Sequence, residues 1–171
     1  MTLLVLCRHV AAGETADELA GRVASYQPEV VYSSPLERAR RTAEALARRC
    51  ATDVRLDERL REIDFGDVEG LGFDDLPPGL QRDLLVRPAA VRFPGGETYR
   101  ELRARVAEAL EEIARADARV AVVSHAGAIR AAFATWLDLD DAVIWRLDQR
   151  HGSLNVVELI DGTAIVRLLN G

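Results

Sequence analysis

The hydrophobic pattern of the chain contains three continuous apolar runs, at Thr2–Cys7, Glu29–Tyr32 and Arg119–Ser124. An apolar run of this length without polar alternation is typical of a strand that is buried on both faces, as in a parallel sheet. The first and third runs lead directly into polar residues whose side chains can do chemistry. The pattern therefore predicts three strands of a sheet, two of which end at candidate site residues.

A helix is predicted directly after the second run. Ser34 offers a capping hydroxyl, Pro35 suits the first helical position, and Glu37 completes a capping box. Apolar residues then recur with helical spacing to about Cys50, so that one stripe of this helix packs against the sheet. The arginines between these apolar positions are expected to form a solvated face. They are Arg40, Arg41, Arg48 and Arg49.

Two further helices are predicted in the second half of the chain. Thr98 and Glu101 form a second capping box, and an apolar stripe of period 3.6 continues from there to about Ala116. After the third apolar run, the residues from Ile129 to Trp136 again show helical spacing.

The segment of residues 57–96 lacks a sustained period. It holds four of the six prolines and six of the twelve glycines, which favours a long excursion with short helices that acts as a lid or a site wall. Closer to the C-terminus, apolar stretches predict strands at Val143–Trp145, Leu154–Ile160 and Ala164–Leu169. Asp161-Gly162 predicts a hairpin between the last two.

These elements predict an α/β protein. Strands that alternate with helices before an antiparallel margin indicate a three-layer α/β/α sandwich with a mostly parallel, mixed sheet. The length of 171 residues is that of one domain, and we expect residues 1–171 to form a single domain with a substantial core.

The charge balance narrows the functional classes. With 28 acidic and 22 basic residues, the formal net charge is -6, so no overall positive field attracts nucleic acid or an anionic membrane. All 22 basic residues are arginines. The absence of lysine excludes Schiff-base chemistry on this chain, and arginine suits two-point binding of anions.

No residue pattern indicates a metal site, a redox motif or a membrane span. Cys7 and Cys50 lack CxxC spacing, and the three histidines lack the short spacings that metal sites favour. The opening apolar run is too short for a signal-peptide core, and no apolar run approaches the roughly 20 residues of a membrane span. We expect a cytoplasmic protein that needs no metal and no other cofactor.

Four side chains at predicted strand and helix ends are candidates for an anion site. His9 and His125 each follow a buried strand, and ligands bind at the carboxyl ends of parallel strands in open α/β sheets. Arg8 precedes the first histidine, and Arg38 lies in the opening turn of a helix, where free amides also attract an anion. Together they describe a phosphate pocket. Each of these residues, considered alone, is better explained by an ordinary structural role.

Five short segments carry a more specific signal: Leu6-Cys7-Arg8-His9, Ser33-Ser34-Pro35-Leu36-Glu37-Arg38-Ala39, Leu60-Arg61-Glu62-Ile63-Asp64-Phe65-Gly66, Phe93-Pro94-Gly95-Gly96-Glu97-Thr98 and Val123-Ser124-His125-Ala126-Gly127. In this order they resemble the histidine phosphatase superfamily, which includes phosphoglycerate mutases, fructose-2,6-bisphosphatases and α-ribazole phosphatases. The resemblance extends over essentially the whole chain. It is greatest for α-ribazole phosphatase-like members.

This resemblance implies a phosphoglycerate mutase-like fold and assigns roles to five residues. His9 would be the nucleophile, and it would attack as a neutral imidazole because neighbouring arginines disfavour its protonation. Arg8, Arg38 and His125 would bind the phosphoryl group, with His125 also in the catalytic set. Glu62 would protonate the leaving alcohol and then deprotonate water. Fixed positive donors would stabilise the transferred group, so no metal ion is required. For Glu62, the alternative is a surface carboxylate in a loop.

The chain departs from the family's pattern around the nucleophile. The family has glycine after the histidine, whereas this chain has Val10, which would be strained if the position needs a positive φ and would otherwise narrow the pocket. Ser33 follows His9 by only 24 positions, so the usual first helix must be short. The asparagine that commonly lines the substrate pocket has no counterpart. For His151, the third histidine, an exposed loop position is expected rather than a ligand.

We therefore expect a metal-independent phosphatase that hydrolyses a small phosphorylated metabolite through a phosphohistidine on His9. One alternative is a catalytically impaired member that binds phosphate or a phosphoprotein, because Val10 blocks attack. Another is a mutase-type phosphotransferase, which the short site walls disfavour. No sequence feature identifies the natural substrate. A homodimer through the antiparallel margin is compatible with the sequence, but nothing in the sequence requires one.

Overall fold

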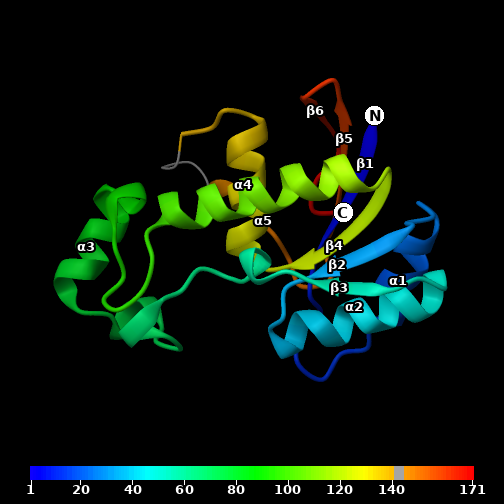
Figure 1. Ribbon diagram of the computed structural model, residues 1–171. Coiled ribbons are helices and arrows are strands. Elements are labelled where there is room, and N and C mark those ends of the chain that lie inside the picture. The colour runs from blue at the N-terminus through cyan, green and yellow to red at the C-terminus, as the bar shows by residue number, and fades with distance from the viewer. Residues whose placement is uncertain (141–144) are drawn as a thin grey trace.

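A mixed sheet runs through the centre of the protein in the computed structural model, which describes residues 1–140 and 145–171 (Figure 1). Its strand order is β3-β2-β4-β1-β5-β6. The first four strands in this order pair in parallel, whereas β5 and β6 are antiparallel, as the sequence predicts. The strands are β1 (Thr2–Arg8), β2 (Val30–Ser33), β3 (Val54–Leu56), β4 (Arg119–Ser124), β5 (Leu154–Ile160) and β6 (Thr163–Leu168).

Side chains of the inner strands alternate between two separate cores, because successive residues of a strand point to opposite faces of the sheet. In β1, Leu4 and Leu6 belong to the core on one face, and Val5 and Cys7 belong to the core on the other. All four side chains are at most 2% exposed. This burial on both faces is the reason for the continuous apolar runs in the sequence.

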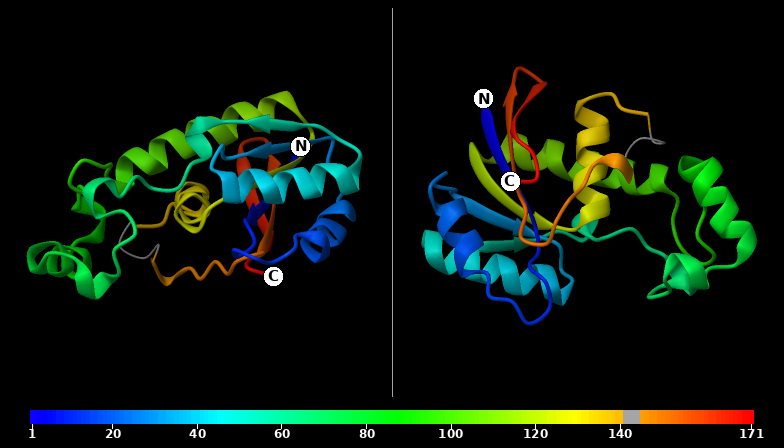
Figure 2. Two further views of the ribbon diagram at one scale, coloured as in Figure 1. Left: turned by 90° about the horizontal axis from the view of Figure 1, so that it is seen from below. Right: turned by 180° about the vertical axis from the view of Figure 1, so that it is seen from behind.

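Helices cover both faces of the sheet (Figure 2). α1 and α2 pack on the core that holds Val5 and Cys7, and α4 and α5 pack on the other. The predicted three-layer α/β/α sandwich is thereby confirmed. The helices of the outer layers are α1 (Asp17–Ala24), α2 (Glu37–Cys50), α4 (Tyr99–Ala116) and α5 (Ala126–Trp136).

The capping box predicted at the start of α4 is confirmed. The Thr98 hydroxyl accepts a hydrogen bond from the Glu101 N–H, and the Glu101 carboxylate accepts one from the Thr98 N–H. This reciprocal pair satisfies two of the amides that the first helical turn leaves free.

The start predicted for α2 is wrong. The helix begins only at Glu37, and Pro35 lies ahead of it. Neither half of the proposed capping box forms: the Ser34 hydroxyl lies against the imidazole of His125, and the Glu37 carboxylate pairs with Arg41 one turn further along. The Ser34 hydroxyl instead accepts from the Leu36 N–H at 3.3 Å and reaches a distant partner in His125.

Residues 57–96 form the predicted excursion, which first runs alongside α4 and then extends beyond its N-terminal end (Figure 1). It contains α3 (Pro78–Val86) and four short 3-10 turns, at Glu58–Leu60, Gly66–Val68, Phe73–Asp75 and Pro88–Ala90. Of the strand predicted over Val143–Trp145, residues 143 and 144 lie outside the described part of the chain. Trp145 lies in a helical turn and not in a strand.

The C-terminal hairpin forms as predicted, although β6 begins one residue earlier than expected. Its two loop residues, Asp161 and Gly162, have φ values of 50° and 83°. Two positive φ angles are what a type I′ turn needs to match the twist of the strands it joins.

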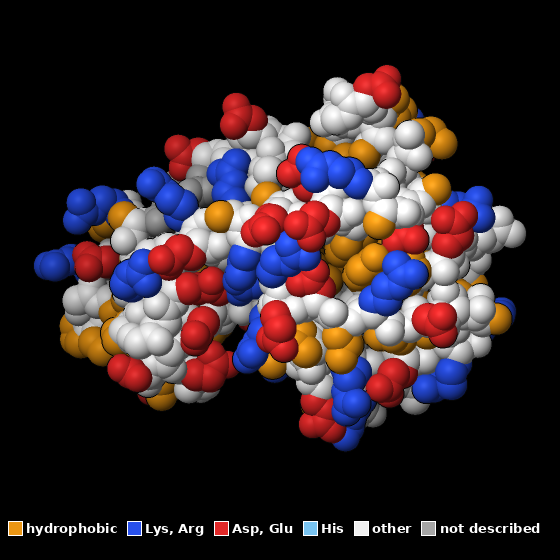
Figure 3. Space-filling model, in the orientation of Figure 1, with side chains coloured by type: hydrophobic (Ala, Val, Ile, Leu, Met, Phe, Trp, Pro, Cys, Tyr) orange, Lys and Arg blue, Asp and Glu red, His pale blue; other side chains and the backbone are white. Residues whose placement is uncertain are grey.

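The surface carries charges of both signs. Figure 3 shows arginines and carboxylates interspersed over one face. Surface ion pairs join the two signs of charge, for example Arg59 with Glu112 and Arg92 with Glu101. The solvated face predicted for α2 is confirmed by the exposure of its arginines. None of the helices in the described ranges is both long enough and apolar enough to cross a membrane.

Candidate active site

The predicted site residues lie where the carboxyl ends of β1 and β4 meet. These strands are parallel neighbours, and their register pairs Arg8 with Ser124. His9 and His125 are therefore the next residues along two adjacent strands, and the centroids of their rings lie 5.1 Å apart. The structure brings the two histidines together at one end of the sheet, as their positions after buried strands predict.

His9 is buried and held in one orientation. Its Nδ1 lies 2.8 Å from the carbonyl oxygen of Val10, which can only accept, so Nδ1 carries the proton and Nε2 keeps its lone pair. Burial lowers the pKa of His9 to about 4, and the charges of Arg38 and Arg8 act in the same direction. His9 is thus a neutral imidazole at neutral pH, with its nucleophilic nitrogen on the side away from Val10.

His125 is fully buried, and its Nε2 lies 2.8 Å from the Ser34 hydroxyl. The hydroxyl accepts from the Leu36 N–H, and within the described residues Nε2 is the acceptor available for its own proton. We therefore assign the Ser34 hydroxyl as the donor to Nε2, which leaves the imidazole proton on Nδ1. Nδ1 is buried and has no hydrogen-bond partner among the described residues. Burial, followed by the charge of Arg38, lowers the pKa of His125 to about 2. His125 therefore presents an unpaired N–H donor.

Arg8 is held by the segment that precedes β5. Its Nη1 donates to the carbonyl oxygen of Gln149 at 2.6 Å, and its Nη2 donates to Nε2 of His151 at 2.9 Å. The Nε of Arg8 is buried without a partner in the described part of the chain. Burial lowers the pKa of Arg8, but the group stays charged because arginine has so high a starting value.

His151 is exposed, as predicted, but it is not an isolated loop residue. Its ring centroid lies 5.0 Å from that of His9, and its Nδ1 lies 3.3 Å from the His9 carbonyl oxygen. The signal that could have placed it is the pairing of β5 with β1: Leu154 lies opposite Cys7, so residues just before Leu154 lie beside those just after Cys7.

A buried amide pair anchors this segment. Gln149 and Asn155 are at most 1% exposed. Gln149 Nε2 donates to Asn155 Oδ1 at 3.0 Å, and Asn155 Nδ2 donates to Gln149 Oε1 at 2.9 Å and to the Leu6 carbonyl oxygen at 3.2 Å. The main chain that binds Arg8 is thereby tied to β1 itself.

Arg38 and Glu62 line one cleft of about 600 Å³. Arg38 lies in the first turn of α2 and is exposed, as expected for a residue that meets a ligand from the rim. Its charge acts on both His9 and His125. The amino end of α2 adds the free amides of a first turn, which also favour an anion.

Glu62 is half-buried beside the amino end of α5. Its carboxylate accepts hydrogen bonds from the N–H groups of Ile63 at 3.0 Å and Gly127 at 3.3 Å. A Cβ atom at position 127 would collide with this carboxylate, so the approach requires glycine there. Glu62 is therefore not a free surface carboxylate: it is fixed to the residue two positions after His125.

The strain expected at Val10 is absent. Val10 is not among the residues with positive φ, and its side chain packs, partly buried, against the core that α1 and α2 cover. The polar contacts of Val10 come from its main chain. Its carbonyl oxygen orients His9, and its N–H donates to the Thr42 hydroxyl at 3.3 Å. Neither contact requires glycine at this position.

The arrangement offers a neutral nitrogen nucleophile, an N–H donor, two guanidinium groups and a carboxylate around one end of the sheet. Such a set can bind a tetrahedral anion, attack it and move a proton. Within residues 1–140 and 145–171, no group of three or more His, Cys, Asp or Glu side chains could hold a metal ion.

Curated proteins are similar to this chain in sequence. The chain is 38% identical over 146 residues to "Bifunctional protein Rv2228c" of Mycobacterium tuberculosis, a match that covers 82% of this chain and 40% of that protein. The chain thus spans about two fifths of the length of that relative. It is 34% identical over 154 residues to "Probable phosphoglycerate mutase GpmB" of Salmonella paratyphi C, covering 86% and 72% of the two chains.

Solved structures share the fold. The mycobacterial glucosyl-3-phosphoglycerate phosphatase Rv2419c in complex with inorganic phosphate superimposes with a TM-score of 0.87 at 25% identity, over 100% of this chain and 98% of that one. A candidate α-ribazole-5′-P phosphatase from Escherichia coli K-12 superimposes with a TM-score of 0.83 at 20% identity, over 99% and 96%. At 20% identity the likeness concerns the fold alone.

The family model for the histidine phosphatase superfamily (branch 1) matches residues 12–171. The matched range begins after Arg8 and His9, so those two residues are placed by the structure and by their own short motif. The match covers nearly the whole chain and agrees with the fold and with the curated relatives. On these grounds, the chain belongs to the histidine phosphatase superfamily.

Proposed function

We propose that this protein is a phosphatase that hydrolyses a small phosphomonoester through a phosphohistidine on Nε2 of His9. One observation carries the proposal: a neutral imidazole with a free Nε2 lies beside the ring of His125 and is acted on by the charges of Arg38 and Arg8, and Arg38 lines the same cleft as Glu62. The family supports phosphatase chemistry, and the phosphohistidine is our inference from this geometry.

In the first step, Nε2 of His9 attacks phosphorus, and the bond from phosphorus to the ester oxygen breaks. Arg8, Arg38 and the Nδ1–H of His125 bind the phosphoryl oxygens, whose negative charge these fixed donors stabilise. The buried, unpaired Nε of Arg8 and Nδ1 of His125 suit this role, because buried polar groups normally have partners. Protonated Glu62 gives its proton to the leaving oxygen, which departs as an alcohol.

In the second step, water attacks the phosphohistidine. Glu62, now a carboxylate, takes a proton from this water as its oxygen bonds to phosphorus. The bond from phosphorus to Nε2 breaks, which returns His9 to its neutral form and releases inorganic phosphate. Glu62 ends the cycle protonated, ready for the next ester.

The lining of the cleft favours hydrolysis over mutase transfer. Five carboxylates and three arginines line it, and one of those arginines, Arg105, is already bound to Glu97. A second phosphate or a carboxylate on the substrate would meet this negative excess. A larger, mostly apolar hollow of about 750 Å³ shares Glu69 with the cleft. We place the organic part of the ester on that side.

The second candidate, a protein that binds phosphate or a phosphoprotein without turnover, depended on a blocking effect of Val10. Val10 has no positive φ, and its side chain packs against the core that α1 and α2 cover and does not line the cleft of Arg38 and Glu62. These observations weaken that candidate. A small metabolite as substrate, independence of metal and other cofactors, a cytoplasmic location and the absence of nucleic-acid or membrane partners stay predictions from the sequence. The same holds for a homodimer.

The first prediction concerns His9. Wild-type protein should release p-nitrophenol from p-nitrophenyl phosphate without added metal, and a rapid quench should trap phosphate on the protein that is stable to alkali and labile to acid. His9→Ala should lower turnover by more than about 1000-fold and abolish the trapped phosphate, because no other group occupies the position of Nε2. Phosphate binding with neither signal in the wild type would favour the binding protein instead.

The second prediction concerns Glu62. Glu62→Gln should slow the hydrolysis of an alkyl phosphate by roughly 100-fold or more, because the poor leaving group needs a proton. With p-nitrophenyl phosphate the loss in the first step should be much smaller, since p-nitrophenolate leaves without one. Rapid-quench measurement of the phosphorylation step with both esters separates these cases. Equal losses with the two esters would argue against a proton donor.

The third prediction concerns the two buried imidazoles. Their pKa values lie at about 4 for His9 and about 2 for His125, below the ordinary value of 6.5, so both rings stay neutral as the pH falls from about 8 to about 5.5. The imidazole C2–H signals in NMR spectra, assigned with His9→Ala and His125→Ala, should therefore not shift over this range. Titration of either signal near pH 6.5 would contradict the burial on which the mechanism depends.

A further inference from the structure

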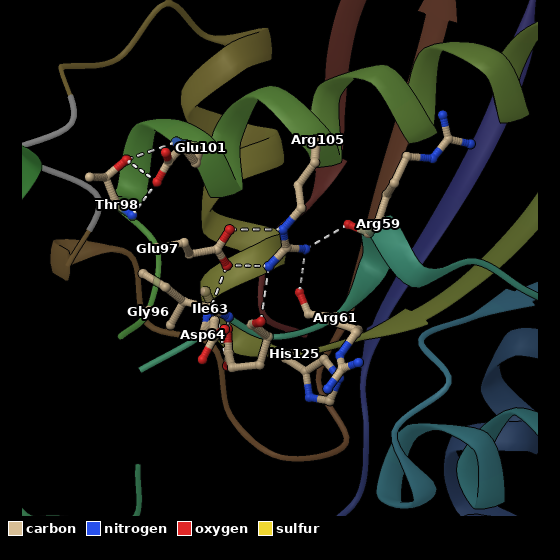
Figure 4. Close-up of polar contacts among 12 residues, drawn as sticks. Arg59, Arg61, Ile63, Asp64, Gly96, Glu97, Thr98, Glu101, Arg105 and His125 are labelled. Atoms are coloured by element: carbon tan, nitrogen blue, oxygen red, sulfur yellow. Dashed lines mark hydrogen bonds and ion pairs between the residues drawn. The ribbon is translucent and has the colours of Figure 1, made fainter. Parts of the chain in front are cut away.

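Arg105 of α4 binds the loop that carries Glu62 (Figure 4). Its Nη1 donates to the carbonyl oxygens of Arg59 and Arg61, both at 2.8 Å, and its Nη2 donates to the carbonyl oxygen of Glu62 at 2.9 Å. Its Nε and Nη2 also bind the Glu97 carboxylate. A guanidinium has five N–H donors, and these five contacts engage all of them.

Glu97 extends the same contact to the far end of the loop. Its carboxylate accepts from the Asp64 N–H at 2.9 Å, and its own N–H donates to the Asp64 carbonyl oxygen at 3.0 Å. A Cβ atom at Gly96 would collide with that carbonyl oxygen, so the close approach depends on glycine. The ion pair is largely shielded, with side-chain exposures of 23% for Arg105 and 16% for Glu97.

The loop is consequently held at successive peptide groups. Arg105 does not bind the carbonyl oxygen of Leu60, which accepts instead from the Ser124 hydroxyl at 2.7 Å. All four carbonyl groups of residues 59–62 therefore have partners on α4 or β4. Neither Arg105 nor Glu97 is among the groups that would bind phosphate. Their contacts converge on the main chain from which Glu62 projects toward Gly127.

We propose that Arg105 and Glu97 are positioning residues for Glu62, which they hold at the place where the leaving oxygen departs. The inference rests on the proposed function, because it concerns the proton that Glu62 transfers. A positioning role can be told apart from general stabilisation of the fold. Displacement of a proton donor slows phosphoryl transfer from esters with poor leaving groups much more than from esters with good ones.

The same helix supplies a matched control. Arg103 also donates to main-chain carbonyl groups, those of Ala134 at 2.8 Å and Leu139 at 3.1 Å, and to the Thr135 hydroxyl at 3.2 Å. These partners lie in and just after the carboxyl-terminal part of α5, away from Glu62. Arg103→Met therefore removes a comparable set of hydrogen bonds from α4 without touching the loop of residues 59–64.

The test compares wild type, Arg105→Met, Arg105→Lys and Arg103→Met in the full chain, with thermal melting as the check on folding. The readout is the rate of phosphorylation by p-nitrophenyl phosphate divided by that by an alkyl phosphate. We expect this ratio to rise about 10-fold to 100-fold in Arg105→Met, to rise less in Arg105→Lys, and to stay at the wild-type value in Arg103→Met. If Arg105→Met does not fold, Glu97→Gln serves, because its amide oxygen still accepts from Asp64.

A double-mutant cycle completes the test. In the Glu62→Gln background, Arg105→Met should leave the ratio unchanged, because the group it positions is already gone. Equal losses with both esters, a change matched by Arg103→Met, or a full further effect in the Glu62→Gln background would overturn the inference. Failure of wild-type protein to hydrolyse either ester would instead overturn the proposed function, and the inference with it.

Discussion

The parallel pairing of β1 with β4 is the interaction on which the site depends. Because both strands are buried on both faces, their register cannot slip without moving apolar side chains of two cores at once. That register pairs Arg8 with Ser124 and so sets His9 beside His125. The packing of the two cores thus defines the distance between the two imidazoles, although the core residues take no part in the proposed reaction.

Burial at this strand end also decides the chemical state of the site. A solvated imidazole would be partly protonated near neutral pH, whereas the removal of water from His9 and His125 keeps both neutral. Neutral rings have one proton each, and the acceptor or donor next to each ring determines where it lies. The Val10 carbonyl leaves Nε2 of His9 free, and the Ser34 hydroxyl leaves Nδ1–H on His125. One ring becomes a nucleophile and the other a donor.

The sequence predicted those parts of the structure that depend on local pattern. The strands before His9 and His125, the capping box at Thr98 and the Asp161-Gly162 hairpin are each signalled by residues that are neighbours in sequence, and all of them form. The contact of Ser34 with His125, 91 positions away, has no local signal, and the hydroxyl accepts from Leu36 rather than from Glu37. The sequence predicts an exposed loop position for His151 but not its place beside His9, because that place depends on the pairing of β5 with β1. Long-range partners leave no periodic signal.

Glu62 sits on a loop, and Arg8 at the end of β1 is held by one, and loops need anchors to reach catalytic precision. Two anchors serve here. The Gln149–Asn155 amide pair ties the segment that binds Arg8 to β1, and the Arg105–Glu97 ion pair ties the loop of Glu62 to α4. The first anchor acts through the side chain of Gln149 and the main-chain carbonyl of Leu6 in β1. The second acts on main-chain carbonyl groups of the Glu62 loop, which every residue has, so the side chains of residues 59 and 61 can vary while the main-chain path stays. Val10 follows the same logic: its carbonyl orients His9, and a carbonyl is indifferent to whether the residue is valine or glycine. This explains how a departure at that position leaves the geometry of the nucleophile intact.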